Sequence, residues 1–122
     1  RSIDDLLGHP VAGLSWEGFV IETLLGVAPP GTVGGFYRTS VGAEIDLILD
    51  LPRRKRWAVE VKRGSAPRLE KGFHFAREDL EPHRSFLVHS GNERYPIADG
   101  VEGIALHELA QELRDSGARG AG

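Results

Sequence analysis

The sequence contains no cysteine, so neither a disulfide bond nor a thiolate metal site can form. It also has no apolar run long enough to span a membrane, and no charged-then-apolar leader opens it. Hydrophobic residues make up 40% of the chain and charged residues 27%, which is ordinary for a globular protein. These features favour a soluble, cytoplasmic protein.

Methionine is absent as well, and the first residue is Arg1. We therefore expect the chain to be one domain of a longer protein. Its 122 residues are enough for one hydrophobic core and too few for two ordinary ones. The prediction is a single domain over residues 1–122.

Charge is distributed unevenly along the chain. Residues 1–50 contain two Lys/Arg against seven Asp/Glu, whereas residues 53–84 contain ten against five. The net charge of -3 argues against a wholly basic nucleic-acid-binding domain. A local phosphate-facing patch in the middle of the chain stays open, although a solvated turn and helix face is the simpler interpretation.

Hydrophobic periodicity predicts alternating helices and strands, with Ser15 as the N-cap of the first well-defined helix. This order predicts an α/β (α+β) domain, with a mixed β-sheet flanked by helices, because hairpins and a helical crossover both occur. The predicted elements are a short helical segment within 1–14, a helix over 16–27, strands over 33–40, 42–51 and 57–62, a helix from 67 to about 80, strands over 84–89, 95–97 and 103–106, and a helix from 106 to about 117 with a frayed tail.

Acidic residues lie unexpectedly within the two strands of residues 42–62. Charged residues are depleted in strands, so their presence at the centre of a hairpin needs a reason. Strict alternation puts the aliphatic residues of the first strand on one face and its acids on the other. The first set is Ile45, Leu47, Leu49 and Leu51, and the second is Glu44, Asp46, Ile48 and Asp50.

A short connection between these strands suggests a register. If Asp50 faces Arg56, antiparallel pairing places Asp46 opposite Glu60. Two carboxylates in that position repel each other unless a cation or a proton lies between them. The register therefore predicts a shared cation or proton.

The same register places Glu44 opposite Lys62. A slip of two residues would instead pair Asp46 with Lys62 as an ordinary ion pair. The sequence leaves both registers open.

Glu17, Asp46, Glu60 and Lys62 form the constellation that favours a metal site. An oxygen-rich carboxylate set suits Mg²⁺ or Mn²⁺, which retain several waters. Lys62 would lie along the strand from Glu60, where it could orient water or neutralise charge on a phosphate. Structural ion pairs are the competing interpretation, and for Glu17 a favourable interaction with the helix dipole competes evenly.

These residues also carry a family resemblance. A helix that carries Glu17, followed by Gly42-x-Glu44-Ile45-Asp46 and then Glu60-Val61-Lys62, resembles the PD-(D/E)xK nuclease superfamily. Ile45 stands where the superfamily has proline. Over nearly the whole chain the sequence is similar to the C-terminal domain of unknown function that follows AAA-type ATPase domains in prokaryotes. The residues that carry this resemblance are Gly8-His9-Pro10, Gly13, Trp16-Glu17, Tyr37-Arg38-Thr39, Gly42, Glu44-Ile45-Asp46, Glu60-Val61-Lys62 and Tyr95-Pro96.

The resemblance implies a restriction-endonuclease-like core in the order αβββαβ(β)α. It implies Asp46 and Glu60 as metal ligands, with the Val61 carbonyl as a third, Lys62 as the catalytic lysine and Glu17 as an accessory acid. The implied activity is Mg²⁺- or Mn²⁺-dependent hydrolysis of phosphodiester bonds in DNA or RNA. The alternative is a non-catalytic module of an ATPase that binds nucleic acid or protein.

Basic residues next to this constellation are candidate phosphate contacts. Arg53, Arg54 and Lys55 lie at the predicted hairpin tip, and Arg63 and Arg68 follow the second strand. An exposed turn is the favoured interpretation for the tip.

The five histidines show no ligand spacing, so polar or surface roles are favoured for them. Trp16 and Trp57 are expected in the core. The glycine-rich residues 31–35 lack the Lys-Ser/Thr of a nucleotide loop.

Overall fold

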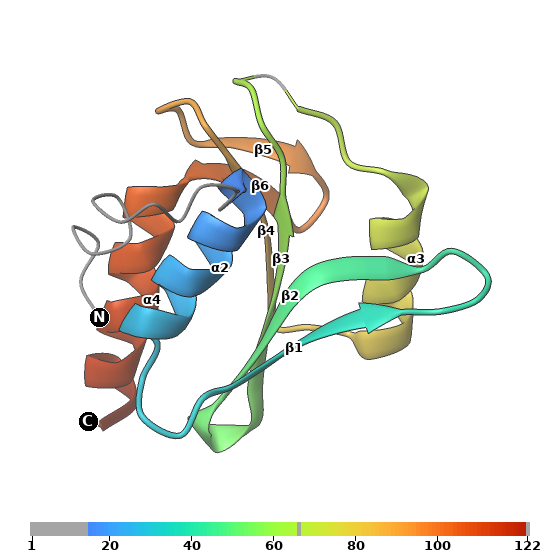
Figure 1. Cartoon of the computed structure of the whole chain (residues 1–122). Helices are drawn as coiled ribbons and strands as arrows, with labels where there is room; N and C mark the ends of the chain where they lie inside the picture. The colour runs from blue at the N-terminus through green and yellow to red at the C-terminus, as the bar shows by residue number, and fades with distance from the viewer. Residues whose placement is uncertain (1–14, 66, 122) are drawn as a thin grey trace.

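The computed structural model describes residues 15–65 and 67–121, and the predicted helical segment within residues 1–14 lies outside them. In these residues a six-stranded mixed sheet runs in the order β1-β2-β3-β4-β6-β5 (Figure 1). The β1–β2, β2–β3 and β5–β6 pairs are antiparallel, and the other two are parallel. The elements are α2 (Trp16–Val27), β1 (Val33–Arg38), β2 (Glu44–Leu51), a 3₁₀ turn η1 (Pro52–Arg54), β3 (Lys55–Val61), α3 (Lys71–Leu80), β4 (Arg84–His89), β5 (Tyr95–Ala98), β6 (Val101–Ala105) and α4 (Leu106–Ala121).

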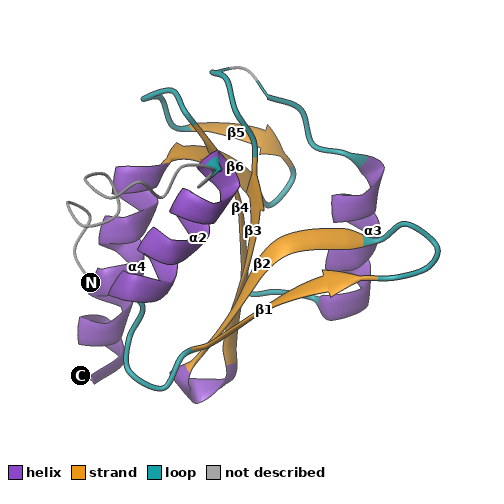
Figure 2. Cartoon of the chain, in the orientation of Figure 1, coloured by secondary structure: helices purple, strands orange, loops and turns teal. Residues whose placement is uncertain are grey.

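Helices cover both faces of the sheet. Helices α2 and α4 lie together on one face, and α3 lies on the other (Figure 2). The larger core joins Leu49, Trp57 and Val59 to Leu24 of α2 and Leu109 of α4. The smaller core packs sheet residues against α3 through Phe73 and Ala76. This confirms the predicted mixed sheet with helices on it.

Local sequence signals account for the first helix. The Ser15 side chain accepts a hydrogen bond from the Gly18 N–H at 2.9 Å, as expected of an N-cap. The helix ends before Pro29, which cannot continue it. Trp16 packs against the larger core and Trp57 is buried within it, as predicted for both. No helix among the described residues is both long and apolar enough to cross a membrane.

Some predicted boundaries are wrong. Helix α3 begins at Lys71, because Glu70 has extended dihedral angles and the preceding residues connect the sheet to the helix. Helix α4 continues to Ala121, four residues beyond its expected end. A Cβ added at Gly117 would lie 3.0 Å from the Pro29 ring, so this glycine lets α4 pack closely against Pro29. Strand β6 begins at Val101, two residues before its expected start.

Gly72 should tolerate no side chain, because α3 approaches the β1–β2 connection closely there. A Cβ at Gly72 would lie 2.4 Å from the Gly42 carbonyl oxygen, which is backbone. Gly72→Ala is therefore expected to lower the free energy of unfolding by about 1–3 kcal/mol. Urea unfolding monitored by circular dichroism measures the change.

Gly26→Ala is the matched control, since a Cβ at this helical position meets nothing within 4 Å. It should raise stability by about 0.5–1 kcal/mol through its better helix propensity. Equal effects of the two substitutions would refute the close approach at Gly72.

Candidate functional site

The β2–β3 pairing has the predicted register. Asp50 lies opposite Arg56, and the two form an ion pair with Nε–Oδ1 at 2.6 Å. The ladder continues to the pair Leu47–Val59. The predicted register is therefore confirmed over this ladder, and the two-residue slip is wrong. The ladder ends at the pair Leu47–Val59, and Asp46 and Glu60 are the next residues in the same register.

A β-bulge in β2 lies beside Asp46. On β1, Gly35 pairs with Ile48 and Tyr37 pairs with Ile45, so β2 has one extra residue in this interval. Ile45 and Ile48 consequently both join the α3 core, although strict alternation predicted opposite faces. Bulges bend a strand and redirect its side chains. In Figure 1, β1 and β2 bend away from β3 towards α3.

Asp46 and Glu60 meet where β2 and β3 diverge. The Asp46 Oδ2 atom accepts a hydrogen bond from the Val61 N–H at 2.9 Å. Glu60 is buried, with 6% of its surface exposed, and its Oε1 atom has no hydrogen-bond partner. Burial first, then hydrogen bonding to Asp46 and the charge of Asp46, raise the pKa of Glu60 to about 8. The pair therefore holds a proton at neutral pH.

Lys62 lies just beyond the end of β3. Its Nζ atom forms an ion pair with Glu70 Oε1 at 2.7 Å, and this contact raises the pKa of Lys62. The Lys62 carbonyl oxygen accepts a hydrogen bond from Trp16 Nε1 at 2.9 Å, which joins α2 to the end of β3. The predicted Glu44–Lys62 pairing is wrong, because Lys62 has left the strand and Glu44 pairs with Arg38.

Glu17 is exposed at the start of α2, but it is electrostatically linked to the carboxylate pair. Burial raises its pKa most, followed by the negative charges of Asp46 and Glu44; Arg38 and Lys62 oppose the shift. The first helix thus contributes a third acidic group near the pair. Among the described residues, however, no three His, Cys, Asp or Glu side chains form a ready-made metal cluster.

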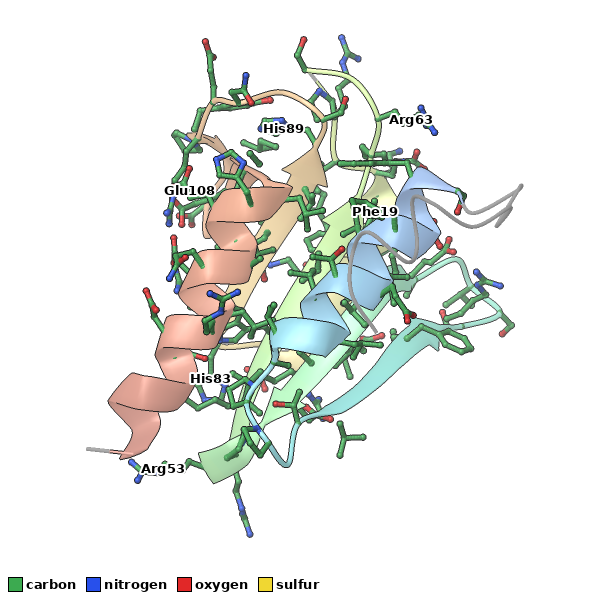
Figure 3. The ribbon with its side chains drawn as sticks, turned by 60° about the vertical axis from the view of Figure 1, so that its left-hand side comes forward. Phe19, Arg53, Arg63, His83, His89 and Glu108 are labelled. Atoms are coloured by element: carbon green, nitrogen blue, oxygen red, sulfur yellow. The ribbon has the colours of Figure 1, made fainter. Side chains whose placement is uncertain are left out.

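The predicted basic residues lie in two places. Arg53, Arg54 and Lys55 are exposed at the β2–β3 turn, and Arg53 is seven residues along the chain from Asp46. At roughly 3.3 Å per residue this separation is about 20 Å, so the turn does not adjoin the carboxylate pair. Arg63 is also exposed and follows Lys62; Figure 3 shows it at the opposite end of the molecule from Arg53.

Arg68 is exposed in the connection that leads to α3. Of the predicted basic set, Arg63 and Arg68 are therefore the members nearest to Lys62 along the chain. The Val61 carbonyl stays a predicted ligand, since the contact seen for Val61 is its N–H to Asp46.

His89 is buried and fully hydrogen-bonded, as expected for a structural histidine. Its Nδ1 atom accepts from the Gly91 N–H at 3.0 Å, and its Nε2 atom lies 2.8 Å from the Glu93 carbonyl oxygen. Because Nδ1 accepts a hydrogen bond, the Nε2 atom is the donor to the Glu93 carbonyl oxygen. His83 Nδ1 accepts from the Arg56 N–H at 3.1 Å. His9 lies outside the described residues.

A family model described as "Domain of unknown function (DUF4143)" matches residues 12–109, an interval that contains the carboxylate pair, Glu17 and Lys62. The chain belongs to the DUF4143 family. Two relatives are the uncharacterized protein Mb2031c of Mycobacterium bovis and the uncharacterized protein Rv2008c of Mycobacterium tuberculosis. Each is 34% identical over 110 residues, covering 88% of this chain. The chain spans about a quarter of their length, 24%. No solved structure matches this DUF4143 chain.

Sequence reasoning missed Glu70 as the partner of Lys62. The two are eight residues apart across an irregular connection, so no strand or helix period relates them. It also missed the ion pair between Arg38 and Glu44, which follows from the β1–β2 register. That register depends on the bulge, which alternation alone does not reveal.

Proposed function

We propose that this DUF4143 domain is a metal-dependent phosphodiesterase of the PD-(D/E)xK type that acts on DNA or RNA. The observation that carries the proposal is the meeting of Asp46 with the buried, hydrogen-bond-deficient Oε1 atom of Glu60. A buried carboxyl oxygen without a partner is costly unless something else satisfies it. A divalent cation with oxygen preference would do so at the point where β2 and β3 diverge.

The fold supports this proposal. The described elements follow the order helix, three strands, helix, strand, as the resemblance implies for a restriction-endonuclease-like core. Asp46 comes from the second strand, and Glu60 with Lys62 from the end of the third. The bulge at Asp46 and the bend of the β1–β2 hairpin separate β2 from β3 next to the pair.

The donor set fits Mg²⁺ or Mn²⁺, which commonly use one or two protein carboxylates and keep several waters. Asp46 and Glu60 would hold the ion, with the Val61 carbonyl as a further donor. When bound, the ion would polarise the scissile phosphate and lower the pKa of a water molecule. Because ion binding requires ionised ligands, Glu60 must release its proton first.

Lys62 would neutralise negative charge that develops on the phosphate. Its ammonium group is held by Glu70, and an exposed pair of this kind exchanges partners at little cost, about 0–1 kcal/mol. Glu17 would accept a proton or orient water, which its raised pKa favours. Arg63 and Arg68 would contact the nucleic-acid backbone next to Lys62.

A second candidate function is non-catalytic binding of nucleic acid or protein within a longer ATPase. One observation favours it: Asp46 accepts a hydrogen bond from the Val61 N–H and the pKa of Glu60 is raised to about 8, so a shared proton can take the place of a metal ion between the two carboxyl groups. The chain spans about a quarter of the length of its two relatives, and the rest of a protein of that length could contain an ATPase domain.

Metal-dependent cleavage distinguishes the two candidates. The chain is incubated with single- and double-stranded DNA and RNA in Mg²⁺ or Mn²⁺, and in EDTA. Cleavage that requires the metal supports the phosphodiesterase. Cleavage of no substrate under any of these conditions supports the binding module.

A further inference from the structure

A pocket lies at the β2–β3 turn, far from the carboxylate pair. Its volume is about 580 Å³, within the usual range for small-molecule sites of roughly 300–1,000 Å³. Pro29, Pro52 and Trp57 provide an apolar floor, and Arg53, Lys55 and Arg84 contribute cationic side chains to its lining. The pocket therefore combines an apolar interior with positive charge.

The positive charge at this pocket is incompletely balanced. Arg84 stacks over Trp57, with its guanidinium carbon 5.0 Å from the ring centroid, and forms an ion pair with Glu112 at 2.9 Å. By contrast, Arg53 and Lys55 have neither an ion pair nor a side-chain hydrogen bond with residues 15–65 and 67–117, whose side chains the structure describes. No Asp or Glu is among the described residues that line the pocket. Two cations are thus available to an anionic ligand.

The turn that carries these cations is conformationally strained. Arg53 and Arg54 both have positive φ, 68° and 59°, in the left-handed region. Two consecutive positive φ values are typical of type I′ hairpin turns, where Asn-Gly is strongly preferred. Two arginines at these positions cost roughly 1–3 kcal/mol each. Strain of this kind concentrates at functional sites. Asn-Gly at these two positions would make the same fold more stable, so the two arginines are expected to serve a role other than stability.

We propose that this pocket binds a phosphate ester attached to a flat or apolar group, such as a nucleoside phosphate. The phosphate would contact Arg53 and Lys55, since guanidinium and ammonium groups are preferred phosphate donors. The remaining group would lie against the prolines and the edge of Trp57. This site is about 20 Å from Asp46 and does not depend on the proposed hydrolysis.

The ligand's source is either a free nucleotide or the phosphorylated end of a nucleic-acid strand. Calorimetric titrations use ADP, inorganic phosphate, adenosine and a 5′-phosphorylated ten-nucleotide strand. ADP is expected to bind at least about tenfold more tightly than phosphate or adenosine alone, because only ADP offers both parts. Tighter binding of the phosphorylated strand than of ADP and of its unphosphorylated form identifies a strand end as the source. Absence of binding by both ADP and the phosphorylated strand overturns the proposal.

The double substitution Arg53→Asn with Arg54→Gly separates ligand binding from folding. It supplies the residues that the turn prefers, so the melting temperature should rise by several degrees. Binding of whichever phosphorylated probe the wild type takes should weaken by about tenfold or more through loss of the Arg53 contact. Lys71→Gln, which replaces an exposed cation at the start of α3 on the other face of the sheet, is the control and should leave binding unchanged. A lower melting temperature with unchanged binding would show that the arginines serve the fold only.

Discussion

Asp46→Asn is expected to reduce metal-dependent cleavage by at least about 100-fold, since it removes one of two charged metal ligands. The fold should survive, because the side-chain amide oxygen of the introduced asparagine can still accept the Val61 N–H. The initial rate of cleavage of a fluorescent oligonucleotide measures the effect. Circular dichroism checks that the variant is folded.

Asp50→Asn is the matched control. Asp50 lies on the same strand and carries the same charge, but its carboxylate pairs with Arg56 away from Glu60. Its replacement should change the cleavage rate less than about twofold and stability by about 1 kcal/mol at most. Equal losses in both variants would show that general negative charge on β2, and not a metal ligand at Asp46, supports cleavage.

The second large effect concerns the pH dependence of stability through Glu60. The folded protein retains the Glu60 proton to about pH 8, whereas the unfolded chain loses it near its ordinary pKa of 4.5. The unfolded state therefore binds fewer protons between these pH values, and stability falls as pH rises through this window. At pH 7 the accumulated cost is about 3 kcal/mol, at roughly 1.4 kcal/mol per pH unit.

Glu60→Gln should remove this cost. The glutamine amide can still donate a hydrogen bond to Asp46, but it has no proton to lose. In the absence of divalent metal, we expect the variant to be more stable than the wild type at pH 7 and nearly equal to it at pH 4. Urea unfolding at several pH values gives the difference curve. A constant difference from pH 4 to pH 8 would contradict the raised pKa of Glu60.

Much of the fold could be predicted from residue patterns. The Ser15 cap and Pro29 predicted the limits of α2, and the charge pair Asp50–Arg56 predicted the β2–β3 register. These features depend on local contacts or on one short connection. Residue type and spacing were sufficient there.

The sequence could not predict the bulge in β2. Ile45 and Leu47 fit strict alternation equally well, and only pairing with β1 and packing against Phe73 of α3 place Ile45 on the other face. The sequence could not predict the partner of Lys62 either. Its partner Glu70 comes from an irregular connection whose path depends on how α3 packs, so tertiary structure determines this contact.

The separation of the basic turn from the carboxylate pair follows from the hairpin itself. Strand length places Arg53 and Asp46 at opposite ends of β2, so the same phosphate cannot contact both. Because the predicted β2–β3 register is correct, this distance could be predicted from the sequence. The pocket beside the turn could not be predicted, since Pro29 and Gly117 reach it from α2's end and from α4.

Mn²⁺ binding at the carboxylate pair tests the central claim most directly. Calorimetric titration of the chain at pH 8.5, where Glu60 is mostly ionised, should show one Mn²⁺ site that weakens as pH falls to 6. Asp46→Asn should abolish binding, and Asp50→Asn should preserve it. Absence of Mn²⁺ binding to the wild type at pH 8.5, or equal binding to wild type and Asp46→Asn, would contradict a metal site formed by Asp46 and Glu60.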